Sequence, residues 1–165
     1  MKRILFVCTG NTCRSSMAEA LFNEVCKQAG GGSDFYKAES AGITAYEGEN
    51  ASAASISVMK KLWNIDISNH RARIVNRKRI EEADLVLTMT RNHKEMIVSA
   101  FPGIKDKVFT LKEYAYGKEN KGPMQEYDYS LDVMDPFGMS DEIYCSCSKE
   151  IKVCIEKLIE KLRKI

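Results

Sequence analysis

The stretch that decides how this chain folds is Val7-Cys8-Thr9-Gly10-Asn11-Thr12-Cys13-Arg14-Ser15. It follows the apolar run Ile4-Leu5-Phe6-Val7, which is typical of a buried strand, and precedes residues 17–22, which have the pattern of a helix. A cysteine thus ends a strand, five residues intervene, and an arginine opens a helix. This layout can hold a tetrahedral oxyanion directly above the thiolate of Cys8.

The physical reason lies in the short turn that contains Gly10. A turn from strand to helix leaves several backbone N–H groups without intrahelical partners, and these groups, with the helix dipole, favour a phosphate. Arg14 adds a planar fork that matches two phosphate oxygens. The same field favours the thiolate of Cys8, and the hydroxyl of Ser15 could donate to the sulfur. A buried cysteine beside a surface arginine is the alternative interpretation, and the strand and helix around the motif favour the phosphate loop.

The bulk composition fits one globular domain over residues 1–165. A net charge of +2 is too small to indicate a nucleic acid or a membrane as partner. The N-terminal apolar run of four residues is far too short for a signal segment or a membrane span, so we expect a cytoplasmic protein. Reduced thiols are then expected for the six cysteines rather than a disulfide framework.

Apolar runs and helical periodicity alternate along the chain. Such alternation predicts an α/β fold, a three-layer α/β/α sandwich around a four-stranded parallel sheet, with ligands bound beyond the carboxyl ends of the strands. The phosphate-binding loop after the first strand would lie at that edge. The expected strands are 2–7, 35–41, 83–89 and 107–111, the expected helices are 16–29, 51–62, 92–101 and 140–164, and the expected long loop is 117–130.

A second candidate group is Asp135, which precedes Pro136 and is therefore held out of the helical region. A mechanism through a cysteinyl-phosphate needs an acid for the leaving group and a base for the attacking water. One aspartate can do both in succession. The alternative for Asp135 is a turn residue that caps the C-terminal helix. Asp132 is the competing acid, and the sequence does not separate the two.

These two groups of residues resemble the low-molecular-weight protein tyrosine phosphatase family. The resemblance runs in matching order along nearly the whole chain, and within the family it is strongest to the bacterial protein-arginine phosphatases. The segments that carry it are Cys8–Ser15, Glu39–Gly42, Asn69–Arg73, Ala83–Thr90, Val108–Tyr114 and Asp135–Gly138.

The resemblance implies a role for each matching residue. Cys8 would be the nucleophile, Arg14 the phosphate clamp and Asp135 the general acid. It further implies a supporting network of Asn11, Ser15, Ser40 and His70, with His70 in a structural role. Cys13 would be the redox partner that traps an oxidised Cys8 as a disulfide. Substrate and phosphate would contact Thr9, Gly10, Asn11, Thr12, Cys13, Ser15, Tyr46 and Phe137.

The phosphorylated side chain stays open between phosphoarginine and phosphotyrosine. Thr12 and Phe137 favour phosphoarginine, because the tyrosine-directed members usually carry an aliphatic residue at the first position and often a tyrosine at the second. Tyr46 favours phosphotyrosine, because those members often place an aromatic wall there. Ser16 also departs from a common proline at the helix start. The stretch 117–130 is longer than the corresponding bacterial loop.

The partners implied are phosphorylated proteins, with inorganic phosphate as product and inhibitor, and no cofactor. We expect no metal site at Cys145, Cys147 and Cys154, because no histidine lies nearby to complete a zinc site. Cys147 and Cys154 are seven residues apart, which suits core packing on one helical face with Ile143, Ile151, Leu158 and Leu162. The cations of residues 70–79 more often form a solvated surface than a nucleic-acid patch. An arsenate reductase would need further redox cysteines in the middle of the chain. A phosphoprotein-binding module is the non-enzymatic alternative, and Asp135 beside Cys8 argues against it.

Overall fold

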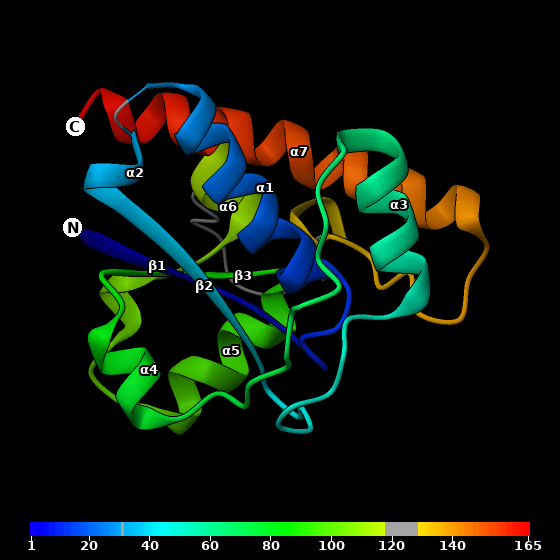
Figure 1. Cartoon of the computed structure of the whole chain (residues 1–165). Helices are drawn as coiled ribbons and strands as arrows, with labels where there is room; N and C mark the ends of the chain where they lie inside the picture. Colours follow the sequence, from blue (N-terminus) through cyan, green and yellow to red (C-terminus); the bar gives the residue numbers. More distant parts are fainter. Residues whose placement is uncertain (31, 118–128) are drawn as a thin grey trace.

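Four parallel strands in the order β2-β1-β3-β4 form the sheet of this computed structural model (Figure 1). The structure describes residues 1–30, 32–117 and 129–165. The strands are β1 (Lys2–Cys8), β2 (Tyr36–Gly42), β3 (Leu85–Thr88) and β4 (Val108–Thr110). The chain moves from β1 to one side and then back across it to β3, so the strand order switches at β1. Cys8 is the last residue of β1 and lies at this switch, as predicted.

The helices cover both faces of the sheet (Figure 1). The longest are α1 (Arg14–Gln28) and α7 (Asp141–Arg163), which pack together on one face with α6 (Leu111–Tyr116). Another, α3 (Ala53–Trp63), packs on α7. The opposite face carries α4 (Arg77–Glu82) and α5 (Arg91–Ala100). The short elements are α2 (Gly32–Phe35) and the 3-10 turns η1 (Lys105–Lys107) and η2 (Tyr129–Leu131).

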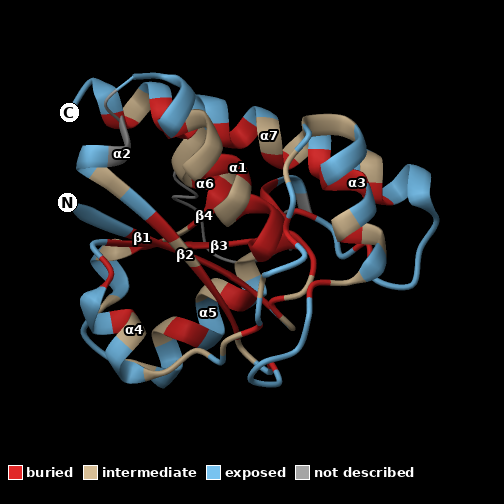
Figure 2. Cartoon of the chain, viewed as in Figure 1, coloured by how far each residue is buried: buried red, intermediate tan, exposed pale blue. Residues whose placement is uncertain are grey.

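Alternating residues of β1 supply two separate cores, which appear as buried segments on both sides of the sheet in Figure 2. Ile4 and Phe6 face α1 and α7, whereas Leu5 and Val7 face α4 and α5. Because successive side chains of a strand point to opposite faces, an unbroken apolar run is what a strand covered on both faces requires. The predicted three-layer architecture is therefore confirmed.

The helix boundaries differ from the predictions at several places. The first helix begins at Arg14 rather than Ser16, so the arginine belongs to its first turn. Three short helices were not predicted from the sequence: α2, α4 and α6 have four to six residues and too few apolar positions for a clear period. Ile143 was wrongly assigned to the buried face of α7, since 42% of it is exposed. The predicted loop at 117–130 falls mostly outside the described residues.

Candidate active site

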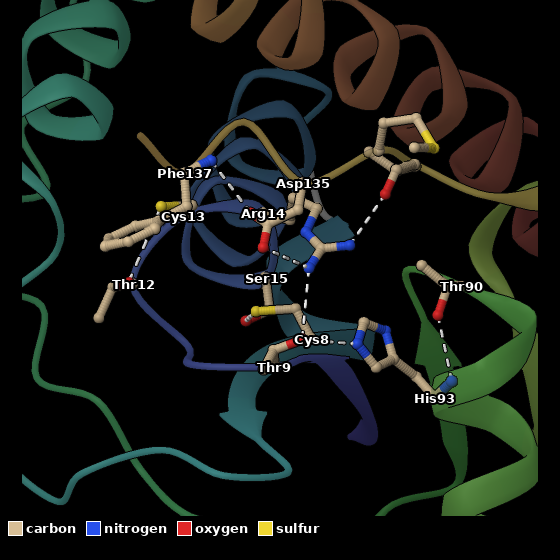
Figure 3. A network of polar contacts seen from close by, with 12 residues as sticks. Cys8, Thr9, Thr12, Cys13, Arg14, Ser15, Thr90, His93, Asp135 and Phe137 are labelled. Carbon is tan, nitrogen blue, oxygen red and sulfur yellow. Dashed lines mark hydrogen bonds and ion pairs between the residues drawn. The ribbon is translucent and has the colours of Figure 1, made fainter. Parts of the chain in front are cut away.

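The loop between β1 and α1 encloses the buried sulfur of Cys8 (Figure 3). The backbone N–H of Asn11 donates to Cys8 Sγ over 3.3 Å, and Ser15 Oγ lies 2.9 Å from the same sulfur. When the thiol is ionised, it can only accept, so the Ser15 hydroxyl must then donate. Hydrogen bonds to the charged form of a group stabilise that form. The loop thus places two hydrogen-bonding groups beside the sulfur at the carboxyl end of β1.

Arg14 is buried, and its guanidinium is held by a hydrogen bond and an ion pair. Its Nη1 donates to the carbonyl of Val133 over 2.9 Å, while its Nη2 lies 3.5 Å from Asp135 Oδ2. Its Nε is buried without a hydrogen-bond partner in the described part of the chain. An unsatisfied donor on a buried charged group is costly. An oxyanion bound in the loop would satisfy that donor.

Asn11 stabilises the conformation of the loop through hydrogen bonds of its side chain and backbone. Its backbone has a φ of 58°, in the left-handed region that asparagine tolerates better than most residues. Its side chain donates to Ser15 Oγ over 2.8 Å and accepts from the backbone of Arg73 over 2.9 Å. The carbonyl of Asn11 lies 2.7 Å from Nε2 of His70. Asn11, Ser15 and His70 therefore form one connected network, in which Asn11 is the central member.

Ser40 belongs to the neighbouring layer of this network rather than to the loop itself. Its hydroxyl donates to Glu19, and the same carboxylate is paired with the guanidinium of Arg73 over 3.1 Å. Ser40 is therefore linked to Asn11 indirectly, through Glu19 and then Arg73. No role for Glu19 or Arg73 was predicted from the sequence. Each is one of many charged residues, and only the fold brings the two together.

Gly42 allows the loop to pack tightly on the end of β2. A Cβ atom at this position would lie 2.5 Å from the carbonyl oxygen of Thr9 and 2.8 Å from the backbone nitrogen of Asn11. Both distances are far below a normal contact. The backbone N–H of Ile43 also donates to the carbonyl of Cys8 over 3.0 Å. The end of β2 thus holds the phosphate loop in position through close packing and a backbone hydrogen bond.

The structure separates the two candidate acids. Asp135 lies at the mouth of the loop, where its Oδ1 accepts from the backbone N–H of Phe137 over 3.1 Å and half of its side chain is exposed. Asp132 is buried and accepts from the backbone N–H of Arg91 over 2.9 Å, at the first turn of α5. Asp132 is therefore occupied by a structural contact. The alternative of a helix cap for Asp135 is wrong, because Ser140 caps α7.

A cavity of about 240 Å³ opens above Cys8. Tyr46 and Phe137 stand at its mouth with 79% and 70% of their surfaces exposed, so two aromatic rings are available to contact a substrate. Ser15 and Asn11 lie beneath the loop rather than in the lining. The lining residues are Cys8, Thr9, Gly10, Thr12, Cys13, Arg14, Thr44, Tyr46, Glu49, Asp135 and Phe137.

Cys13 lines the cavity and also contacts polar groups of other segments. Its sulfur lies 3.4 Å from both Ser52 Oγ and the Tyr144 hydroxyl, and it packs with Val58. Burial, together with the hydrogen bond to Cys13, raises the pKa of Tyr144 to about 12, so this phenol stays neutral. Both Cys8 and Cys13 are free thiols in the structure. Their pairing on oxidation stays a prediction.

His93 is a buried member of the site that was not predicted from the sequence. Its Nε2 lies 2.9 Å from Thr9 Oγ1, which is itself 3.5 Å from Arg14 Nη2 (Figure 3). Desolvation and then the charge of Arg14 lower the pKa of His93 to about 4, against the opposing effect of Asp135. The only signal in the sequence was a histidine in the first turn of a predicted helix, and its partner Thr9 is 84 residues away.

Protonation of His93 should make the fold sensitive to acid. Because the pKa of His93 is about 4 when folded and ordinary when unfolded, the unfolded chain binds the proton more readily between these values. Stability is then fully present above the unfolded pKa and is lost as the pH falls towards 4. When the pH falls from about 7 to about 4.5, we expect the free energy of unfolding of wild type to decrease by about 2 kcal/mol more than that of His93→Gln. Urea denaturation of both proteins measures this difference, and equal losses would contradict it.

The other candidate features have structural explanations. Cys147 and Cys154 are buried in the core, and burial raises the pKa of the Cys147 thiol to about 12, which leaves it protonated. No cluster of three metal-ligating side chains occurs among the residues that the structure describes. Within residues 70–79, four of the cations are ion-paired: Arg73, Arg77, Lys78 and Arg79. No helix in the described ranges is long and apolar enough to cross a bilayer.

The chain is similar to known proteins along nearly its whole length. The profile of the family described as "Low molecular weight phosphotyrosine protein phosphatase" matches residues 3–165. The chain is 42% identical to a protein-arginine-phosphatase of Geobacillus stearothermophilus, over 98% of this chain and 96% of that protein. A low molecular weight protein tyrosine phosphatase from T. tengcongensis has a similar structure, with a TM-score of 0.84 and 44% identity over 98% of this chain and 99% of that one.

A third relative bears on the nucleophile. It is the YwlE arginine phosphatase in the form of a cysteine-to-serine mutant whose active-site serine is phosphorylated. Its structure superposes with a TM-score of 0.85 and 37% identity, over 98% of this chain and 96% of that one.

Proposed function

Because this chain belongs to the low molecular weight phosphotyrosine protein phosphatase family, we propose that it hydrolyses phosphorylated protein side chains through a cysteinyl-phosphate on Cys8. The observation that carries the proposal is that Cys8, Arg14 and Asp135 meet at one cavity. Arg14 contributes buried charge, and Asp135 stands at the mouth of the cavity, where a leaving group would depart. The phosphorylated serine of the related mutant supports Cys8 as the attacking residue.

In the first step, the Cys8 thiolate attacks phosphorus in line with the leaving atom. A sulfur–phosphorus bond forms while the bond from phosphorus to nitrogen or phenolic oxygen breaks. Loop N–H groups and Arg14 stabilise the charge on the equatorial oxygens, since their donors are already oriented. Asp135, in its acid form, gives its proton to the departing atom, so the side chain leaves neutral.

In the second step, water attacks the cysteinyl-phosphate. The Asp135 carboxylate produced in the first step takes a proton from this water, so Asp135 regains in the second step the proton that it gave up in the first. The sulfur–phosphorus bond breaks, and Cys8 is released as the thiolate that Ser15 and Asn11 hold. Inorganic phosphate leaves and competes with substrate for the same loop. These steps balance with protein groups and water alone.

We propose phosphoarginine as the preferred substrate residue. Thr12 lines the cavity, and the one contact of its hydroxyl within the described residues is a long one of 3.8 Å to Cys13 Sγ, so it is available to hydrogen-bond a guanidinium stem. The similarity to a protein-arginine-phosphatase supports this choice. Phosphotyrosine is the alternative, which the exposed ring of Tyr46 at the cavity mouth favours and the T. tengcongensis relative supports.

A comparison of two phosphopeptides tests the substrate. Wild type should hydrolyse a phosphoarginine peptide with a higher kcat/KM than a phosphotyrosine peptide. In Thr12→Ile, we expect this ratio to shift towards phosphotyrosine by about tenfold, because the polar contact is lost and apolar surface is gained. Thr12→Ser is the matched control, since it keeps the hydroxyl and should keep the preference. A wild-type preference for phosphotyrosine, or a ratio that Thr12→Ile leaves unchanged, would reject the assignment.

A generic aryl phosphate separates the remaining functions. Hydrolysis of p-nitrophenyl phosphate is expected of the phosphatase, whereas phosphate binding without hydrolysis would indicate a phosphoprotein-binding module. The arsenate reductase alternative needs redox cysteines between Cys26 and Cys145, and none occurs there. We also propose that the enzyme acts in the cytoplasm, because Cys8 must remain a free thiol and thiols stay reduced in that compartment.

A further inference from the structure

His93 and Thr9 form a polar pair beside the nucleophile that the proposed mechanism does not use. The imidazole lies in the first turn of α5 and is buried, and its Nε2 is 2.9 Å from Thr9 Oγ1. Thr9 follows Cys8 directly and lines the cavity. Its hydroxyl oxygen also lies 3.5 Å from Arg14 Nη2. Figure 3 shows the imidazole and the guanidinium converging on this one oxygen.

The hydrogen-bond partners of the two ring nitrogens of His93 indicate which atom of the pair donates. The Nδ1 of His93 is buried without a partner in the described ranges of the chain. A proton on Nδ1 would leave a buried donor unsatisfied, which is rarer in proteins than an under-used acceptor. The proton of the neutral ring therefore belongs on Nε2, where it is donated to Thr9. The pKa of His93, which desolvation and Arg14 lower to about 4, agrees with a neutral ring.

This assignment makes the Thr9 hydroxyl oxygen an acceptor on the side of His93 and Arg14. A guanidinium can only donate, so Thr9 Oγ1 accepts from both His93 and Arg14. Its own proton is then free to point elsewhere, and the cavity above Cys8 is the space that Thr9 lines. An oxygen of a bound phosphoryl group would accept that proton. The pair thus converts a freely rotating hydroxyl into an oriented donor.

We propose that His93 is a positioning residue that acts through Thr9, orienting its hydroxyl toward the phosphoryl group and holding Nη2 of Arg14. The inference rests on the proposed phosphatase activity. His93 itself touches neither substrate nor the reacting atoms in this scheme. Its contribution must therefore disappear when the Thr9 hydroxyl is removed.

A double-mutant cycle tests this dependence. His93→Leu and Thr9→Val should each lower kcat/KM for p-nitrophenyl phosphate about tenfold, with a matching rise in the inhibition constant of inorganic phosphate. The double variant should lose about tenfold rather than about a hundredfold, because both changes remove the same interaction. A hundredfold loss in the double variant, or full activity in His93→Leu, would overturn the proposal. Turnover by wild type tests the proposed function separately.

Two further variants distinguish positioning from packing. The amide nitrogen of His93→Gln reaches the place of Nε2, whereas that of His93→Asn reaches only the place of Nδ1, so Gln should restore activity to within about threefold and Asn should not. Equal activity of the two would overturn the proposal, and this comparison stands even if His93→Leu does not fold. Thr90→Ala is the control, since Thr90 Oγ1 caps α5 through the backbone of His93. It should lower Tm but not kcat/KM, and a loss equal to that of His93→Leu would show a purely structural role.

Discussion

Replacing Cys8 with serine should abolish turnover while phosphate still binds. The serine hydroxyl has nearly the shape of the thiol, but it is not ionised at neutral pH and is a far weaker nucleophile, so we expect kcat to fall by at least about 10⁴-fold. Ser15, Asn11 and Arg14 remain in place, so the loop keeps its donors for an oxyanion. Stopped assays with p-nitrophenyl phosphate measure the loss, and calorimetry with inorganic phosphate measures the retained binding.

The chain offers a matched control and a direct view of the intermediate. Cys145→Ser makes the same chemical change on α7, where the residue is half-buried and absent from the cavity lining, and it should keep wild-type turnover. Because the related mutant carries a phosphorylated serine, intact-mass spectrometry of Cys8→Ser after incubation with substrate should detect a slow phosphoserine adduct. Substantial turnover by Cys8→Ser would show that the mechanism is wrong.

The parts of the site that could be predicted are those whose residues are neighbours in the sequence. The segment from Cys8 to Ser15 is continuous in the sequence, so the strand that ends at Cys8 and the helix that begins at Arg14 determine where its donors point. The four strands were predictable for a similar reason, since a strand buried on both faces needs an unbroken apolar run. For both features the information is local.

The parts that could not be predicted depend on contacts between distant segments. Asp132 and Asp135 are three residues apart, and contacts of their segment with distant residues bury the first and leave the second half-exposed. Among these contacts are the bond from the backbone N–H of Val133 to the carbonyl of Met89 and the bond from the backbone N–H of Arg91 to Asp132. His93 reaches Thr9 because β3 lies next to β1 in the sheet. The short helix α6 is a different case. Its capping box of Thr110 and Glu113 is readable in the sequence, but six residues give too little periodicity to reveal a helix alone.

The second large effect is expected for Asp135→Asn. The amide cannot give up a proton to the leaving group or take one from water, so kcat on phosphopeptides should fall about 10²- to 10⁴-fold. The phosphate donors of the loop are unchanged, and KM should therefore change little. With p-nitrophenyl phosphate the leaving group needs little help from an acid, whereas hydrolysis of the cysteinyl-phosphate still needs a base. Rapid-mixing experiments should then show a burst of nitrophenol followed by a slow steady state.

Asp132→Asn is the control that decides between the two carboxylates. It keeps a side-chain oxygen for the backbone N–H of Arg91, and this bond lies outside the cavity. We expect its kcat within about threefold of wild type, with any loss appearing as a lower Tm. If Asp132→Asn removed turnover and Asp135→Asn did not, the general acid would have been assigned to the wrong residue. If both retained turnover, water would have to protonate the leaving group, and the exposed position of Asp135 beside Arg14 would have only an electrostatic role.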